Sequence, residues 1–145
     1  YEAQLYRRNS QSSLAMSEEY DLALLCFKYS SSSSVGLKEI RFGKNPESGQ
    51  SVVAIGTPEG LQNAVSYGQV LEYNKINAGN DESLKKVKFD VIVHNAAIDH
   101  GSSGGALIDT SGKLVGINFA GYSDGVYGCA IPISKVIEFM NEYVY

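Results

Sequence analysis

The sequence predicts an all-β fold that ends in one helix, and three observations carry that prediction. Short apolar segments recur along the 145 residues, and turn residues separate them. Glycine is abundant, with 15 residues against 3 prolines, which suits many tight turns. Near the end of the chain the pattern changes to the i, i+3, i+4, i+7 spacing of an amphipathic helix, at Ile133, Val136, Ile137 and Met140. A barrel or sandwich covered at one end by a C-terminal helix is therefore expected.

The expected strands are apolar runs bounded by Gly, Pro, Asn or Asp. They occupy residues 3–8, 22–27, 51–56, 64–73, 105–109, 113–119 and 127–131. A further strand over residues 86–94 is predicted from alternation, because Val87, Phe89, Val91 and Val93 are apolar and the residues between them are mostly polar. Such alternation is typical of a strand with one face in water.

The remaining segments give the helix start and the connection between two units. The helix begins after Pro132 in this interpretation, with Ser134 as its N-cap. A serine tract at residues 30–34 opens a polar stretch, and we take residues 29–50 as a connection that holds at most one short strand at 37–42. An ordinary surface loop inside one barrel is the alternative.

Composition argues against several classes of function. Lys and Arg number 12 against 16 Asp and Glu, so no basic surface for nucleic acid is expected. Apolar runs are far shorter than the ~20 residues that span a bilayer, so we expect no membrane insertion. Cys26 and Cys129 have no metal or redox spacing, and we expect two buried thiols rather than a disulfide, with no metal and no cofactor.

The stretch GSSGG, residues 101–105, places Ser103 between glycines. In an α/β-hydrolase such a serine sits between a strand and a helix, and the triad histidine follows it. No histidine follows Ser103, and strands are predicted beyond it, so that fold is excluded. In the other order of a serine triad the histidine comes first, and a glycine-bearing turn lets backbone N–H groups converge on an oxyanion.

Four blocks carry a specific resemblance, namely YDLALL, SVVAIGTPEGLQNAVSYGQV, NAAIDHGSSGGALIDTSGKLVGIN and YGCAIPIS. In order and separation they resemble the trypsin-like serine proteases of the HtrA (DegP) type, from about Tyr20 to Met140. The resemblance implies a chymotrypsin-like double β-barrel, with the last strands of barrel 1 at residues 1–28 and a complete barrel 2 with its helix at 51–145. It also implies Ser103 as nucleophile, Asp21 as triad acid, and an oxyanion hole from Gly101, Ser102 and Ser103.

The base is the main departure from this pattern. The resemblance places the triad histidine before Tyr1, and the chain holds only His94 and His100. His94 continues the polar face of its strand, where a solvated structural role is expected. His100 is so near Ser103 in one loop that it is hard to aim within the ~3 Å that a base requires.

Four smaller departures lie in or near the serine loop. Ser102 replaces an asparagine of the family pattern, which is a mild change because the backbone N–H is what counts, and Ala106 replaces a proline without expected effect. His100 in place of another proline and Asn95 in place of an aspartate are expected to change the resting shape of the oxyanion loop. Because the triad histidine is missing from these 145 residues, we expect them to be a truncated part of a serine endopeptidase that is nearly inactive alone. The alternative is a pseudoprotease that holds an extended peptide without cutting it.

The expected substrate is a peptide or an unfolded protein. The resemblance assigns its binding site to Ala97 and to the strand residues Ile117, Asn118, Phe119 and Ala120. Since these carry no acidic side chain, a small apolar residue such as Val, Ala or Ile is expected before the cleaved bond. These residues are alternatively plain core strand. By resemblance, a trimer is possible for a longer protein, and an extracytoplasmic or cell-envelope location is implied.

Overall fold

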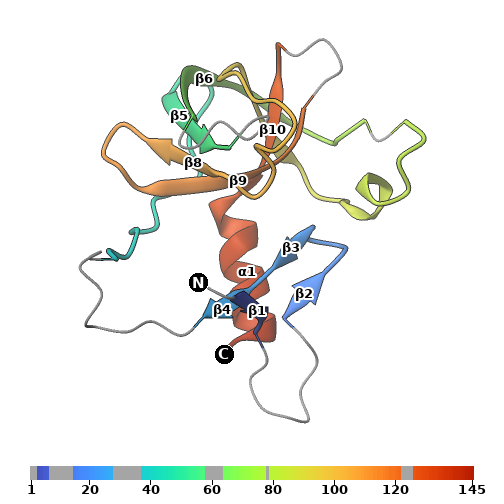
Figure 1. The fold of residues 1–145 in the computed structure, drawn as a ribbon. Coiled ribbons are helices and arrows are strands. Elements are labelled where there is room, and N and C mark those ends of the chain that lie inside the picture. The colour runs from blue at the N-terminus through green and yellow to red at the C-terminus, as the bar shows by residue number, and fades with distance from the viewer. Residues whose placement is uncertain (1–2, 7–14, 28–36, 58–63, 78, 122–125) are drawn as a thin grey trace.

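A computed structural model of the chain describes residues 3–6, 15–27, 37–57, 64–77, 79–121 and 126–145. Strands dominate this part of the chain, and one α-helix follows the last of them (Figure 1). The elements, in order, are β1 (Ala3–Leu5), β2 (Met16–Ser17), β3 (Leu22–Ala23), β4 (Leu25–Phe27), β5 (Ser51–Gly56), β6 (Ala64–Asn74), β7 (Val91–His94), β8 (Ala106–Asp109), β9 (Leu114–Gly121), β10 (Gly128–Pro132) and α1 (Ile133–Tyr143). The expected all-β fold with a C-terminal helix is confirmed.

Strands β5 to β10 close into a barrel in the order β10-β7-β6-β5-β8-β9, with antiparallel neighbours. The β8–β9 hairpin shows why the sequence turns where it does. Asp109 Oδ1 accepts hydrogen bonds from the N–H groups of Ser111 (2.8 Å) and Lys113 (3.0 Å), and Gly112 takes a φ of 78°. The predicted turn at residues 109–112 thus forms through an Asp side chain and a glycine in the left-handed region.

Two apolar clusters lie on opposite faces of the barrel wall. Each barrel strand supplies at least one residue to the cluster that fills the interior, which contains Val52, Ala54, Val70, Ile92, Ala96, Leu107, Val115 and Ala130. The second cluster lies between the wall and α1, and includes Val91, Val93, Ile131, Ile133 and Val136. Because β7 runs between the two clusters, all four of its residues are buried.

The expectation of a strand over residues 86–94 with a wet face was therefore wrong. The strand covers only Val91–His94, and a 3-10 turn at Leu84–Lys86 precedes it. The apolar alternation ahead of Val91 instead packs a loop, since Val87 is buried and Phe89 packs against the second cluster. The optional strand at 37–42 is reduced to a single parallel bridge between Phe42 and Leu114.

The helix begins one residue earlier than its predicted cap. Pro132 is the N-cap, so Ser134 lies inside the first turn and does not cap it. Asn45 takes that role from a distant part of the chain, because its Oδ1 accepts the Ser134 N–H at 3.1 Å and its Nδ2 donates to Ser134 Oγ at 2.9 Å. A free amide of the first helical turn is thus satisfied by a residue 89 positions away.

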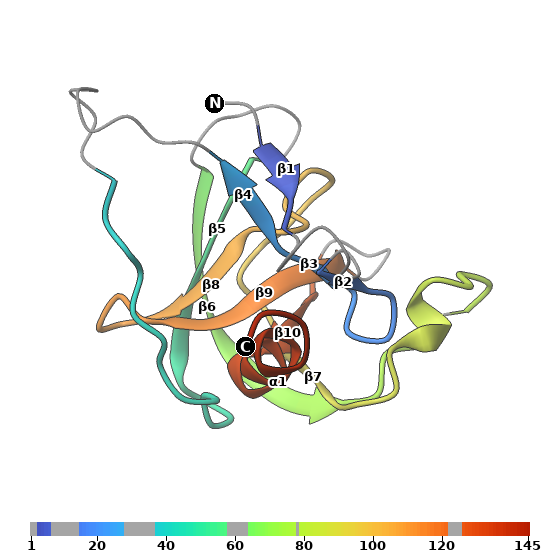
Figure 2. The same ribbon diagram turned by 90° about the horizontal axis from the view of Figure 1, so that it is seen from below.

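The N-terminal strands form two small sheets, β1 with β4 and β2 with β3. Strands β2 and β3 lie beside α1 in both views (Figures 1 and 2). The ion pair of Glu18 with Lys86 joins the β2–β3 turn to the 3-10 turn before β7. Cys26 in β4 is exposed and Cys129 in β10 is buried, so the expectation of two buried thiols holds only for Cys129; neither forms a disulfide.

The expected serine tract at residues 30–34 lies outside the described residues, as do Arg7 and Arg8 of the first expected strand. Among the described helices, none has the length and apolar character to cross a membrane. In the same ranges, no group of three or more His, Cys, Asp and Glu side chains is arranged to hold a metal ion.

Candidate active site

The loop from Asp99 to Gly105 presents Ser103 at the surface. Its N-terminal half is a tight turn, in which Ser102 N–H donates to Asp99 O at 2.9 Å and Asp99 N–H donates to Ser102 Oγ at 3.2 Å. The glycines then let the chain curl, since Gly101 has a φ of 95° and Gly104 a φ of 83°. The loop is closed by Gly105 N–H, which donates to Ser102 O at 2.9 Å.

Two backbone amides of this loop are candidate oxyanion donors. The N–H groups of Gly101 and Ser103 make no hydrogen bond within the part of the chain that the structure describes. The N–H of Ser102 is already engaged by Asp99 O. In this conformation the expected trio of donors is therefore reduced to Gly101 and Ser103.

His100 gives this loop a bond that a proline could not give. The N–H of His100 donates to Asp99 Oδ1 at 2.7 Å. Proline lacks that N–H, so the departure from the family pattern supports the turn instead of disturbing it.

Ser103 and Asp21 line the same two clefts, although they are far apart in the sequence. The first cleft, of about 570 Å³, also contains Asp81, Asp99 and His100. The second, of about 590 Å³, is lined by both residues together with apolar side chains of β9 and α1. The hydroxyl of Ser103 donates to Phe119 O at 3.2 Å.

Asp21 sits at the end of the β2–β3 turn with a φ of 52°, the only positive value for a described residue other than glycine. Partial burial and the nearby Asp81 carboxylate raise the pKa of Asp21. Asp81 itself stays anionic, because the hydroxyl and N–H of Ser83 and the N–H of Leu84 donate to it and lower its pKa. Two carboxylates from distant segments thus face one cleft.

Neither His94 nor His100 forms a side-chain hydrogen bond with Ser103 in the described part of the chain. His100 is exposed, and its side chain has no hydrogen bond to Ser103 among the described residues. The expected solvated role of His94 was wrong, since His94 is 0% exposed and its Nε2 lies 3.0 Å from Asn118 Oδ1. It is buried because it lies on the same face of β7 as Ile92, which belongs to the cluster that fills the barrel interior.

The strand expected to pair with substrate divides into two parts. Ile117 pairs with Ala106 of β8, and Asn118 exchanges main-chain bonds with Gly104 (2.7 Å) and Gly105 (2.9 Å). Beyond them, Phe119, Ala120 and Gly121 continue past the start of β8 and line the first cleft. The edge beside Ser103 is therefore residues 119–121, while the Asn118 side chain points into the barrel.

Ala97, together with Ser102 and Asn118, lines a separate cavity of about 50 Å³. Ala97 does not line either of the two clefts that contain Ser103. Its neighbour Ile98 lines both this cavity and the first cleft. A Cβ at Gly121 would come within 3.8 Å of Ile98, and one at Gly128 within 2.7 Å. Ile98 thus fills the space beside the two glycines and gives the first cleft an apolar side chain next to Gly121.

Sequence reasoning missed Asp81, Ile98 and the part that α1 plays in the second cleft. No local pattern marks Asp81, because it reaches Asp21 only through the loop between β6 and β7. The apolar spacing of α1 did indicate a buried face, and Val136, Phe139 and Met140 from that face line the second cleft.

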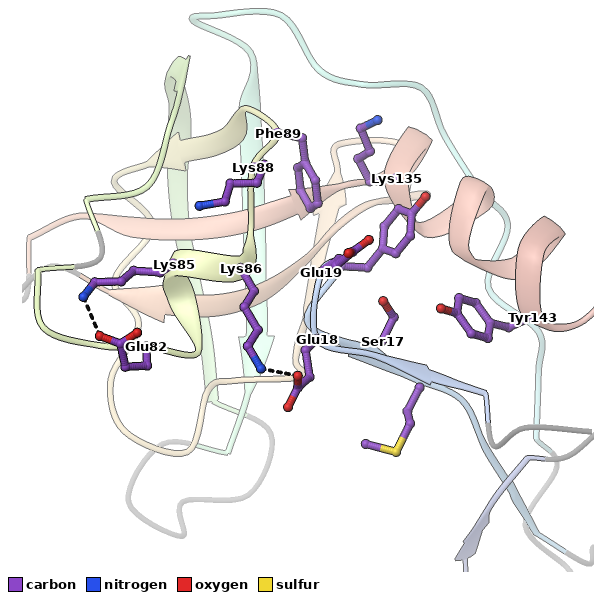
Figure 3. A pocket seen from close by; sticks show the side chains of 12 residues that line it. Ser17, Glu18, Glu19, Glu82, Lys85, Lys86, Lys88, Phe89, Lys135 and Tyr143 are labelled. Carbon is purple, nitrogen blue, oxygen red and sulfur yellow. Dashed lines mark hydrogen bonds and ion pairs between the residues drawn. The ribbon is translucent and has the colours of Figure 1, made fainter.

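A wider hollow of about 1130 Å³ lies between the β2–β3 turn, the 3-10 turn and α1 (Figure 3). Its charged lining includes the Lys86–Glu18 and Lys85–Glu82 ion pairs. None of the expected site residues lines it. The hollow therefore marks the joint between the N-terminal strands and the barrel, away from Ser103.

The barrel, the glycine-bearing serine loop and the facing aspartate define a class of protein. A family model described as a trypsin-like peptidase domain matches residues 1–117. The chain belongs to this trypsin-like peptidase family.

Individual relatives narrow the class to the HtrA type. Serine protease HTRA4 of Homo sapiens is 31% identical over 131 residues, which is 89% of this chain and 27% of that protein. Serine protease HTRA1 of Xenopus laevis is 35% identical over 127 residues, or 86% of this chain and 26% of that protein. The chain is thus an HtrA-type trypsin-like domain that spans about a quarter of the length of these relatives.

Similarity to solved structures supports the same assignment. The HtrA-type protease AlgW with a decapeptide matches with a TM-score of 0.76 and 30% identity, over 97% of this chain and 39% of that one. Rv3671c from M. tuberculosis, in an inactive form, matches with a TM-score of 0.73 over 99% of this chain and 65% of that one. At 19% identity, the second likeness shows the fold alone.

Proposed function

We propose that this chain supplies the nucleophile and the acid of a serine endopeptidase, with Ser103 and Asp21 in these roles. The histidine base comes from a segment outside these 145 residues, since neither His94 nor His100 is placed to serve. The observation that carries the proposal is that Ser103 and Asp21 line the same two clefts. In this proposal residues 1–28 are the last strands of a first barrel, 29–50 the connection, and 51–145 the second barrel.

The mechanism follows the triad chemistry. The histidine takes the proton of Ser103 Oγ as the oxygen attacks a peptide carbonyl, and the Asp21 carboxylate stabilises the resulting imidazolium. The developing oxyanion accepts hydrogen bonds from the N–H groups of Gly101 and Ser103. The histidine then returns the proton to the leaving amine, and water hydrolyses the acyl-enzyme. At rest, Ser103 Oγ donates to Phe119 O, so this bond must be exchanged for one to the histidine.

An extended peptide is the substrate that best fits the surface. AlgW, a related HtrA-type protease, has been solved with a decapeptide. In the chain described here, residues 119–121 offer a strand edge beside Ser103, where a peptide backbone can pair. Ile98, between Gly121 and Gly128, favours a small apolar side chain such as Val, Ala or Ile before the cleaved bond.

The decisive experiment compares two lengths of the protein. The 145-residue chain and a version extended by its natural upstream coding sequence are assayed with peptides that carry Val or Ala, or Lys, before the cleaved bond. We expect cleavage of the Val and Ala peptides by the extended version, and none above background after Ser103→Ala. The isolated chain should lack activity, because loss of one triad member costs on the order of 10⁴ to 10⁶ in kcat.

A peptide-binding module without catalysis is the second candidate. It is favoured by the finding that neither histidine of the chain is hydrogen-bonded to the Ser103 hydroxyl. If the upstream sequence carries no histidine, and the extended protein binds the Val peptide equally well with and without Ser103→Ala but cleaves nothing, this reading replaces the first. Binding is measured by calorimetry on both lengths.

A further inference from the structure

The buried side chain of His94 is connected to the serine loop through one intervening residue, Asn118. His94 is opposite Gly128 of β10 and Val70 of β6, and it is fully buried. A Cβ at Gly128 would lie 2.6 Å from His94 Cε1, so the wall around the ring has no spare room. A side chain of this polarity in such a place requires its hydrogen bonds to be accounted for.

The bonds of Asn118 determine which nitrogen of His94 carries the proton. Asn118 Nδ2 donates to Ala106 O at 3.3 Å, which turns Asn118 Oδ1 toward His94 Nε2 at 3.0 Å. Because Oδ1 only accepts, Nε2 must donate, and the neutral ring keeps its lone pair on Nδ1. That Nδ1 is buried and makes no hydrogen bond to any residue that the structure describes.

Asn118 in turn holds the segment that follows Ser103. Its carbonyl accepts the N–H of Gly104 at 2.7 Å, and its N–H donates to Gly105 O at 2.9 Å. The next carbonyl, that of Phe119, accepts the hydroxyl of Ser103 at 3.2 Å. A movement of Asn118 therefore displaces the loop on both sides of the Ser103 hydroxyl.

We propose that His94 is a positioning residue for Ser103, which acts through Asn118, so that a change of charge on its ring alters the Gly104–Gly105 segment. The role rests on the proposed function, because it matters for catalysis only if Ser103 is the nucleophile. Protonation at Nδ1 adds a positive charge and a second N–H to a ring that has no spare room, while Nε2 continues to donate to Asn118 Oδ1. The change in charge at the ring is therefore passed to Asn118 and to the loop bonds that Asn118 makes.

The surroundings favour the neutral ring at ordinary pH. Burial lowers the pKa of His94, against smaller opposing effects from the Asn118 side chain and the Ala96 backbone. The strands and the loop packed around it carry Tyr67, Glu72, Tyr73, Asp109, Cys129, Asp99 and His100, and none of these contributes to the shift. The protonation state of His94 therefore depends on burial, which favours the neutral ring, and on the Asn118 side chain and Ala96 backbone, which favour the charged ring.

The test is a pH titration of the ¹⁵N-labelled 145-residue chain by NMR, which needs neither substrate nor base. It follows the ring nitrogens of both histidines and the amides of Ser103, Gly104 and Gly105. We expect His94 to hold its proton on Nε2 at neutral pH and to titrate below the ordinary value of about 6.5. The amides of Gly104 and Gly105 should move with the His94 midpoint.

Two variants separate the histidines. In His94→Gln the amide can still donate to Asn118 but does not titrate, so the loop amides should keep their neutral-pH positions and lose that transition. His100→Gln should leave the transition in place. Loop amides that stay fixed while His94 titrates, or that follow His100, would overturn the proposal. Loss of all barrel resonances at the His94 midpoint would also overturn it, by making His94 a support of the whole barrel. None of these readouts depends on whether an extended protein cleaves peptides.

Discussion

Tyr20 and Phe139 meet edge to face, with ring centroids 6.0 Å apart. Tyr20 directly precedes Asp21, and Phe139 is a buried residue of α1 that stacks on Tyr143 at 5.0 Å. Tyr20 also lies 6.0 Å from Phe89, in the loop before β7. The position of the proposed triad acid is thus fixed by the C-terminal helix and by a loop of the barrel that carries the serine.

Replacing Tyr20 should loosen Asp21 without unfolding the barrel. Tyr20→Ala removes two aromatic contacts, each worth about 0.5–1.5 kcal/mol beyond area burial. We expect faster amide exchange in Met16–Ala23 and unchanged protection in β5 to β10, measured by hydrogen exchange. Tyr20→Phe keeps both ring contacts and is the matched control. Equal exchange in Tyr20→Ala and Tyr20→Phe would show that the rings do not hold the turn.

Removing the charge of Asp81 should lower the pKa of Asp21. Asp81→Asn keeps the Oδ1 that accepts from Ser83 and Leu84, so the loop stays in place while the repulsion disappears. The ¹³C shift of the Asp21 carboxyl, followed against pH, measures the change. Glu82→Gln is the control, because Glu82 does not contribute to the Asp21 shift.

The raised pKa of Asp21 also makes the stability of the folded chain depend on pH. A raised pKa in the folded state favours the neutral form of Asp21, so its contribution is fully present below the ordinary value of 3.8 and is lost as pH rises through the folded pKa. Asp81→Asn should reduce that loss. Because Asp81→Asn also gives up the charge that the Ser83 and Leu84 donors stabilise, the coupling is measured by the Asp21 titration and not by the urea midpoint, and an unchanged Asp21 titration would contradict it.

The sequence predicted the elements well because their signals are local. Apolar runs, the turn at residues 109–112 and the helical spacing after Pro132 each depend on a few neighbouring residues. The errors came from contacts that no local window contains. Alternation before His94 predicts a wet face, yet α1 covers the outside of β7 and the barrel closes over its inside. The proximity of Asp81 to Asp21 was missed for the same reason, since the two residues belong to distant segments of the chain.

The cap of α1 can be tested on its own. Asn45→Ala removes the acceptor of the Ser134 N–H, and losing such a cap costs about 1 kcal/mol. Asn45→Asp keeps that acceptor and adds a negative charge that the helix N-terminus favours, so it should retain most of the stability. Urea unfolding measures both. A stability for Asn45→Ala equal to that of the parent chain would mean that the cap contributes nothing.

Two glycines that flank Ile98, Gly121 and Gly128, should respond differently to the same added methyl group. Gly128→Ala places a Cβ 2.6 Å from His94 Cε1 and 2.7 Å from Ile98 Cδ1, and overpacking of this kind costs about 1–3 kcal/mol. In Gly121→Ala the nearest atom is 3.6 Å away, an ordinary contact. Urea midpoints should therefore fall for Gly128→Ala and change little for Gly121→Ala. Equal midpoints would mean that the wall around His94 yields easily.

The buried His94 should also make the chain sensitive to mild acid. Because its pKa is lowered in the folded state, the unfolded chain takes up the proton first as pH falls. The contribution of His94 is thus fully present above the ordinary value of about 6.5 and is lost as pH falls toward the folded pKa, at no more than about 1.4 kcal/mol per pH unit. Urea unfolding at several pH values measures this loss.

His94→Gln provides the comparison that isolates the effect. Asp21 and the other carboxylates titrate in both proteins, so their contributions cancel in the difference between the two stability curves. We expect the difference to be constant above about pH 7 and to move in favour of the variant as the pH falls below about 6.5. His100→Gln, which changes an exposed histidine, is the control variant. Parallel curves for the parent and His94→Gln down to the acid limit would mean that the imidazole is protonated as easily inside the barrel as in water.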